Sequence, residues 1–278
     1  MPAVEQVNHE LGNAFKASLA ARHKLFGHWN SLSSNLLTEI SGEVGFDWLL
    51  IDTEHAPYDL KTLISQLQAL KGTATHAVAR PLLNDPTPIR QLLDIGFRNL
   101  LIPYVQNADQ ARLAVMATRY SPEGVRGVSG YHRNNRYGGD QKYFQTINQN
   151  ISVIAQIESL EAVSRIEEIG AVPGIDALFV GPGDLAASMG RLGQVAHSDV
   201  QEEICRIGSK AVAANLSLGI AAANPQDLAR YLSWGYHFAT IGSDSGLFRS
   251  ASLALVDSFN TLRFVDSGAE LNIPPDIS

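Results

Sequence analysis

The chain has 278 residues, 45% hydrophobic and 18% charged, so its composition is that of a folded globular protein and excludes a disordered one. A formal net charge of −7 without any basic run argues against nucleic acid or an anionic membrane as a partner. No apolar stretch approaches the roughly 18 residues of a membrane span, and the first residues lack the apolar core of a secretory signal. The single cysteine, Cys205, excludes an intrachain disulfide, and we expect a soluble cytoplasmic protein.

Eight short runs of aliphatic, β-branched and aromatic residues alternate with longer segments of helical period. Several runs are apolar on both faces, as expected for a parallel sheet that helices cover. Eight β-then-α units in a chain of this length predict a single-domain (β/α)8 TIM barrel, with a doubly wound open sheet as the alternative. The predicted strands are residues 25–31, 47–53, 76–81, 99–105, 152–158, 177–181, 217–223 and 238–243.

Helix starts between these strands carry capping residues, and one helix end carries a glycine. The signals are Asn84-Asp85-Pro86 before a helix over 86–95, Asn107 before the next helix, and Asn224-Pro225 before a helix that Gly235 ends. Residues 120–150 form a polar, Gly- and Arg-rich connection of unusual length, which we expect to be functional or to lie at an interface. We divide the chain into an N-terminal extension (1–13), the barrel (14–264) and a C-terminal tail (265–278).

Acidic side chains follow the fifth and sixth predicted strands, where the active sites of barrels lie. Glu158 ends the fifth run, and Asp184 follows the sixth. Neighbouring strands lie about 5 Å apart, so the two carboxylates should repel unless a cation lies between them. Oxygen ligands of this kind suit a divalent metal ion. The alternative is that each acid is solvated or, for Asp184, caps the following helix.

Other polar groups gather at the same predicted end of the barrel. The turn Gly181-Pro182-Gly183 can bring main-chain N–H groups close to an anion, although a plain tight turn is the alternative. Arg80 ends an apolar strand, where it must either pair with an acid or bind an anionic ligand. His55 lies near Asp52 and Glu54 in the sequence, and these acids can orient its ring; a solvated histidine is the alternative.

Together these groups suit enolate chemistry on a 2-oxo acid. A metal ion would chelate the carboxylate and keto oxygens, and Arg80 would stabilise the negative charge that develops on the keto oxygen. His55 would move a proton.

Five strings in chain order resemble the HpcH/HpaI-type class II pyruvate aldolases over about residues 14–264. They are "GFDWLLIDTEHAP", "LLDIGFRNLLIPYVQNADQA", "TRYSPEGVRGVSG", "VIAQIES" and "FVGPGDLAASMG". Four others are most similar to family members that act on 2-keto-3-deoxy sugar acids such as 2-dehydro-3-deoxyglucarate: "HRNN", "YFQTINQNISVIAQIES", "RYLSWG" and "GSDSGLFRSA".

The resemblance implies a metal-dependent (β/α)8 barrel that cleaves a 4-hydroxy-2-oxo acid reversibly into pyruvate and an aldehyde. For a glucarate-type substrate that aldehyde is tartronate semialdehyde. The resemblance also implies a homohexamer, built as a trimer of dimers, in which the C-terminal helix is exchanged between subunits.

The same resemblance assigns roles to individual residues. Glu158 and Asp184 would bind Mg²⁺, Mn²⁺ or Co²⁺. Arg80 would bind the keto oxygen and the enolate. His55 would be the base, directly or through water, and Asp52 and Asp94 would orient it. The pyruvate carboxylate would lie at Gly181, Pro182, Gly183 and Asp184, and Gln156 would line the substrate pocket. The family commonly has Ala or Ser where this chain has Gly183. We expect the aldehyde pocket to contain Arg126, His132, Arg133, Ala221 and Ala222, with subunit packing as the alternative.

Three other functions stay open at this stage. A 4-hydroxy-2-oxoheptanedioate aldolase would release succinic semialdehyde with pyruvate. An acyl-CoA lyase of the same superfamily would need a basic nucleotide-binding surface, of which the net charge gives no sign. A noncatalytic barrel that only binds oxo acids would have little use for His55, Arg80, Glu158 and Asp184 together.

Overall fold

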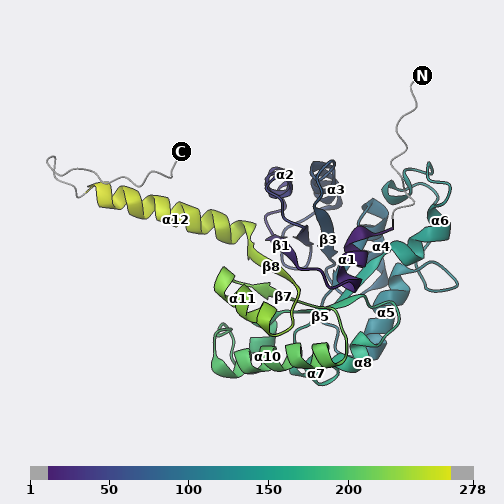
Figure 1. The fold of residues 1–278 in the computed structure, drawn as a ribbon. Helices are drawn as coiled ribbons and strands as arrows, with labels where there is room; N and C mark the ends of the chain where they lie inside the picture. Colours follow the sequence, from purple (N-terminus) through teal and green to yellow (C-terminus); the bar gives the residue numbers. More distant parts are fainter. Residues whose placement is uncertain (1–11, 264–278) are drawn as a thin grey trace.

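The computed structural model describes residues 12–263, and its centre is a closed barrel of eight parallel strands in chain order (Figure 1). The predicted (β/α)8 barrel is confirmed, and the open sheet is excluded. The strands are β1 (Leu25–Asn30), β2 (Trp48–Asp52), β3 (His76–Arg80), β4 (Asn99–Ile102), β5 (Ser152–Ile157), β6 (Ala177–Val180), β7 (Leu218–Ala222) and β8 (Phe238–Ser243).

Strand β4 shows the largest difference between the predicted and observed strand ends. It stops at Ile102, three residues before the predicted end at 105. Pro103 follows and has no N–H to donate to a sheet. The next residue, Tyr104, has a φ of 52°, in the left-handed region that ends an extended strand. This turn directs the backbone of Tyr104 toward the end of β5.

Helices surround the barrel, and their predicted caps are present. Asp85 caps α4, Asn107 caps α5, and Asn224 caps α11, each through its side chain. In the described part of the chain, no helix is both long and apolar enough to cross a membrane. The helices are α1 (Ala14–Ala20), α2 (Asn35–Glu43), α3 (Leu60–Ala69), α4 (Pro86–Ile95), α5 (Ala108–Thr118), α6 (Tyr143–Thr146), α7 (Leu160–Ser164), α8 (Ile166–Gly170), α9 (Pro182–Ser188), α10 (Ser198–Ala213), α11 (Pro225–Ser233) and α12 (Asp244–Arg263), with short 3₁₀ turns η1 (Arg133–Asn135) and η2 (Ile147–Asn150).

Aromatic side chains fill the inside of the barrel. Trp48 of β2 packs against Phe179 of β6 and Phe238 of β8, with ring centroids 6.2 and 6.1 Å apart. Helix α1 closes the amino-terminal end of the barrel, because its buried residues Phe15 and Leu19 join this cluster. The interior is therefore a packed core, and the active site of such a barrel is expected at the carboxyl-terminal ends of its strands.

The long connection 120–150 contains η1, α6 and η2. It packs on the end of α4, where the Asn134 side chain donates to the carbonyl of Leu93 (2.7 Å) and Arg133 donates to the carbonyl of Ile95 (2.9 Å). Helix α4 ends just before β4 begins. The connection therefore lies at the amino-terminal ends of the strands, opposite the open end of the barrel.

Helix α12 projects away from the barrel (Figure 1). Its first residue, Asp244, accepts hydrogen bonds from the main-chain N–H groups of Ser31 and Leu32. Along the helix, Phe248 and Phe259 are 71% and 59% exposed. The predicted tail and residues 1–11 of the predicted extension lie outside the described residues, so the domain boundaries stay a prediction.

Candidate active site

A cavity of about 740 Å³ lies at the carboxyl-terminal ends of the strands. Its walls contain seven of the residues that the sequence placed in the site: Asp52, His55, Arg80, Pro182, Gly183, Ala221 and Ala222. Ser243 of β8 and Leu247 of α12 also line it. A volume in this range is typical of a small-molecule pocket.

Arg80 and Asp52 form a buried ion pair on one wall of the cavity. They stand opposite each other in the register of β2 and β3, so their side chains meet on the same face. Arg80 Nε and Nη2 donate to the two carboxylate oxygens of Asp52 at 2.9 and 2.7 Å. The Trp29 ring lies under the guanidinium at 4.6 Å, and its Nε1 donates to Asp52 at 3.3 Å. Asp52 and Trp29 thus fix the plane of Arg80.

Glu54 joins this ion pair, although it lines a neighbouring cavity and not this one. The sequence singled it out only as a neighbour of His55. Its Oε2 lies 2.9 Å from Arg80 Nη1. Burial raises the pKa of Glu54; the positive charge of Arg80 works against this, while Asp52 and Asp184 add to it. Glu54 lies two residues after Asp52 in "DTE", a spacing that returns a side chain to the same side of an extended backbone. That spacing is the signal that would have identified it.

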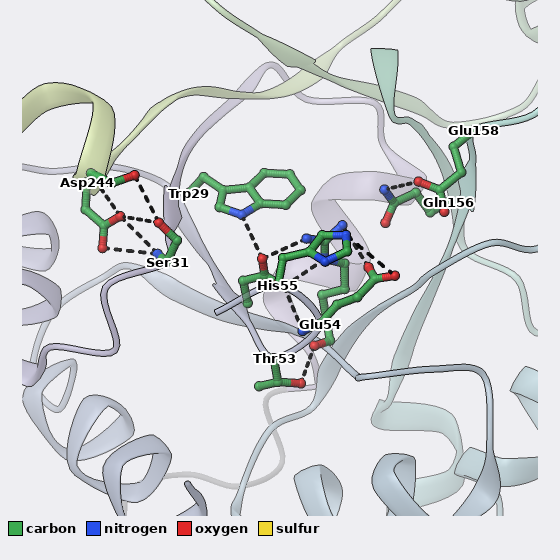
Figure 2. A network of polar contacts seen from close by, with 11 residues as sticks. Trp29, Ser31, Thr53, Glu54, His55, Gln156, Glu158 and Asp244 are labelled. Carbon is green, nitrogen blue, oxygen red and sulfur yellow. Dashed lines mark hydrogen bonds and ion pairs between the residues drawn. The ribbon is translucent and has the colours of Figure 1, made fainter. Parts of the chain in front are cut away.

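His55 lies at the mouth of the cavity, with 67% of its side chain exposed. Its Nε2 is 3.9 Å from Glu54 Oε1 (Figure 2). Asp52, predicted to orient the ring, instead bonds to Arg80, Trp29 and the Glu54 amide. In the described chain the acid nearest to His55 is therefore Glu54, because Asp52 is used to hold Arg80.

Glu158 lies on another side of the site, after β5. It is 4% exposed, and neither it nor Gln156, Gly181 or Asp184 is among the residues that line the cavity. Glu158 Oε1 accepts a hydrogen bond from the Tyr104 amide at 2.7 Å. Its Oε2 accepts one from Gln156 Nε2, also at 2.7 Å (Figure 2). Burial and the charge of Asp184 raise the pKa of Glu158 to about 7. The Tyr104 amide opposes this rise but does not cancel it. Tyr104 is a second contributor that the sequence did not identify.

The Gly-Pro-Gly turn brings Asp184 toward Glu158. Gly181 precedes the first turn of α9 and continues the β5–β6 ladder by donating its N–H to Ile157. A Cβ on Gly181 would lie 3.0 Å from both Glu158 Oε2 and Gln156 Nε2, so only glycine leaves these groups undisturbed. Gly183 differs, because a Cβ there would meet no atom within 4 Å. The Ala or Ser common in the family at that position would therefore fit.

The residues at the ends of β5 and β6 suit a divalent cation. No group of three or more His, Cys, Asp or Glu side chains within residues 12–263 is arranged to hold a metal ion. The pair Glu158 and Asp184, however, has Gln156 beside it: Gln156 Nε2 donates to Glu158, and Gln156 Oε1 is buried without a hydrogen-bond donor. Asp184 is exposed in the first turn of α9, where water can complete a coordination sphere. Two carboxylates and an amide oxygen are ligands that Mg²⁺ and Mn²⁺ accept.

Four predicted residues lie away from this cavity. Arg126 Nη2 donates to Asp94 Oδ1 at 2.6 Å, and His132 Nε2 lies 4.0 Å from the same oxygen. Asp94 is near the end of α4, and Arg133 bonds to the carbonyl of Ile95 beside it. Within one chain, Asp94 and the three basic residues thus lie together at the amino-terminal end of the barrel. Of the predicted aldehyde pocket, Ala221 and Ala222 alone line the cavity.

The barrel and its site define the class of this protein: the chain belongs to the HpcH/HpaI aldolase/citrate lyase family, whose family model matches residues 25–251. This confirms the resemblance seen in the motifs. The chain is 49% identical over 252 residues to a 5-keto-4-deoxy-D-glucarate aldolase of Escherichia coli strain K12, covering 91% of this chain and 98% of that enzyme. This similarity supports a carbon–carbon lyase.

Two solved structures of the family have the same fold. A HpcH/HpaI aldolase/citrate lyase family protein from Burkholderia cenocepacia J2315 is 36% identical, with a TM-score of 0.85 over 89% of this chain and 99% of that one. A HpcH/HpaI aldolase from Desulfitobacterium hafniense DCB-2 is 26% identical, with a TM-score of 0.79 over 92% of this chain and 98% of that one.

Proposed function

We propose that this chain is a divalent-metal-dependent class II aldolase that cleaves 2-dehydro-3-deoxyglucarate (5-keto-4-deoxy-D-glucarate) to pyruvate and tartronate semialdehyde. The observation that carries the substrate is the 49% identity, over 91% of the chain, with a relative named for that activity. The geometry that supports the chemistry is one cavity that contains a fixed guanidinium and an exposed histidine. A pair of acids, Glu158 and Asp184, follows β5 and β6 at the same end of the barrel.

The residues of this chain have distinct parts in the cleavage. Arg80 uses three of its N–H groups on Asp52 and Glu54, which leaves one on each terminal nitrogen for the C2 oxygen of the substrate. His55 takes the proton of the C4 hydroxyl. The C4–O bond becomes the aldehyde, the C3–C4 bond breaks, and its electron pair forms the enolate of pyruvate, whose oxygen faces Arg80. A proton returned to C3 then gives pyruvate.

Glu158 and Asp184 would hold the metal ion, with Gln156 Oε1 near them. When bound, the ion supplies positive charge to the 2-oxo acid end of the substrate. The Tyr104 amide and Gln156 Nε2 keep the Glu158 carboxylate in place through their two hydrogen bonds. Pro182 and Gly183 line the same cavity and offer room and one main-chain N–H for the substrate carboxylate.

The proposal is tested by following pyruvate release with a coupled lactate dehydrogenase. The substrates are 2-dehydro-3-deoxyglucarate and 4-hydroxy-2-oxoheptanedioate, each with Mn²⁺ and after removal of divalent ions on a chelating resin. Malyl-CoA is tested under the same conditions by following glyoxylate, because its cleavage gives glyoxylate and acetyl-CoA. We expect the first compound to have the highest kcat/KM, and the activity to disappear without metal. Full activity in the metal-free protein would refute the class II mechanism. Preference for the second or third compound would refute the substrate, and binding without turnover would indicate a noncatalytic barrel.

The assembly belongs to the same proposal. Helix α12 exposes Leu247, Phe248 and Phe259, and α2 exposes a second apolar stripe at Leu36 and Ile40. Apolar surfaces of this kind mark protein–protein contacts. We propose that α12 packs on a second copy of the chain within a homohexamer in the cytoplasm. Light scattering after gel filtration is expected to give six times the chain mass, and a monomer would contradict it.

A further inference from the structure

A second cavity lies at the opposite end of the barrel. It has a volume of about 470 Å³ and opens between α1, the end of α5, η2 and the turn after α8. Its walls contain two basic residues, Lys16 and Arg119, and one acidic residue, Glu123. None of its lining residues belongs to the candidate active site.

Arg119 is the unusual residue in this cavity. It is 6% exposed, and among residues 12–263 no group accepts a hydrogen bond or forms an ion pair with its guanidinium. Burial lowers the pKa of Arg119, while the charges of Asp176 and Glu123 oppose that effect. A side chain this buried is normally paired when charged. The nitrogens of Arg119 are not among the unpartnered side-chain atoms of the described residues that are sealed from solvent, so they open onto the cavity.

Neither of the nearby acids, Asp176 and Glu123, forms an ion pair with Arg119. Asp176 Oδ1 lies 3.1 Å from Lys16 Nζ, and its Oδ2 accepts a hydrogen bond from the Val153 amide at 2.9 Å. Glu123 Oε1 accepts one from the side chain of Asn148 at 3.1 Å. Arg119 therefore faces a cavity of ligand size with its five N–H donors unused by the described chain.

Lys16 can assist at the same cavity. Its ammonium contacts Asp176 and donates to the carbonyl of Ile151 at 3.0 Å, which uses two of its three N–H groups. Its side chain is 26% exposed, so the third group is accessible.

We propose that this cavity binds a small oxyanion, a carboxylate or a phosphate, through the guanidinium of Arg119 and the remaining N–H of Lys16. The flat guanidinium can donate two parallel hydrogen bonds to such a group. The volume, which is far larger than one ion, allows an organic acid as well as inorganic phosphate. The ligand would not compete with the substrate, since the two sites share no residue.

The test is calorimetric titration of the full chain, freed of divalent ions on a chelating resin, with inorganic phosphate and separately with succinate. We expect saturable binding of at least one probe, and binding at least about tenfold weaker in Arg119→Gln. Arg112→Gln is the matched control, because Arg112 lies on α5 with 56% of its side chain exposed. Arg80→Met removes a cation of the candidate active site, so any loss of binding in this variant identifies anions that bind there. Binding in the Arg119 cavity should be unchanged in Arg80→Met.

Two results would overturn the proposal. One is that neither probe shows saturable binding at concentrations up to about 10 mM, which corresponds to a Kd weaker than about 10 mM. The other is a loss of less than threefold in Arg119→Gln. If that variant does not fold by circular dichroism, Lys16→Met decides: a weakening of threefold or more supports the site, and a smaller change refutes it. Binding of phosphate alone would indicate a phosphate site, and binding of succinate alone would indicate an organic-acid site.

Discussion

The two walls of the candidate active site handle their acids in opposite ways. On the β2–β3 wall, Asp52 and Glu54 both pair with the single guanidinium of Arg80, at 2.7 and 2.9 Å. On the β5–β6 wall, Glu158 has only neutral donors, and the charge of Asp184 raises its pKa further. The acids of the first wall thus contact a cation of their own chain, whereas Glu158 of the second contacts none in the described chain. This difference indicates where a cation would bind.

The largest expected effect comes from removing the charge of the second wall. Glu158→Gln preserves the shape of the side chain but removes one carboxylate. We expect at least about a 100-fold loss of Mn²⁺ affinity and a 10³-fold loss of kcat/KM, because the ion supplies charge to the reacting 2-oxo group. Calorimetry and the coupled pyruvate assay measure the two quantities. Glu161→Gln is the control, since Glu161 is 48% exposed on α7; unchanged Mn²⁺ binding in Glu158→Gln would move the metal elsewhere.

Removing the cation of the first wall should affect catalysis without affecting metal binding. For Arg80→Met we expect kcat/KM to fall about 10²- to 10³-fold, as for loss of a donor to a developing oxyanion, with Mn²⁺ affinity within threefold of the parent. The variant also leaves Asp52 buried without its partner, so we expect a loss of about 3 kcal/mol in unfolding free energy.

Adding Asp52→Asn to Arg80→Met separates the two consequences. The double variant should recover part of the stability, because the charge of Asp52 is gone while Glu54 still lacks its partner. It should recover none of the activity, because the guanidinium is still absent. Arg90→Met, at an exposed arginine of α4, is the matched control. Equal losses of metal affinity in the Arg80 and Glu158 variants would show that the two walls are not separate.

The walls should also differ in their pH dependence. Burial raises the pKa of Glu158 from 4.5 to about 7, so the folded metal-free protein binds this proton more tightly than the unfolded chain. Stability from this group is therefore lost as pH rises from about 4.5 to 7, by about 3 kcal/mol. Burial also works to raise the pKa of Asp52, but the hydrogen bonds and charge of Arg80 outweigh it and lower that pKa. The stability that Asp52 contributes is therefore lost as pH falls, opposite to the direction for Glu158.

Urea unfolding of the metal-free protein at pH 5 and pH 7.5 measures this effect. Glu158→Gln should lose less stability than the parent between these two pH values, by an amount approaching the expected 3 kcal/mol. Parallel pH profiles for the two proteins would mean that the Glu158 carboxyl is already ionised in the folded protein at pH 5.

Much of this site could be predicted from the sequence, because strand ends of a barrel converge. The period of the apolar runs identified all eight strands, and their last residues include Asp52, Arg80 and, one position on, Glu158. The register that pairs Asp52 with Arg80 is not encoded in that period. The same is true of Trp29 beneath the guanidinium, whose position depends on how β1 packs next to β2.

The chain topology also predicts at which end of the barrel a connecting segment lies, whereas its composition does not. Residues 120–150 follow helix α5, and a helix in a β-then-α unit returns the chain to the amino-terminal ends of the strands. Arg126, His132 and Arg133 therefore had to lie opposite the cavity of their own chain. Asp94, near the end of α4, follows the same rule.

The smallest expected effect tests how the second wall holds its acid. Tyr104 donates its amide to Glu158 from a left-handed conformation, with φ of 52°, and its side chain is 56% exposed. Tyr104→Gly permits that conformation, whereas Tyr104→Val disfavours it by about 1 kcal/mol or more and should displace the amide. We expect Mn²⁺ affinity to fall about tenfold in the valine variant and to stay within threefold in the glycine variant. Because both variants lose the same exposed ring, equal affinities would show that the backbone of Tyr104 does not position Glu158.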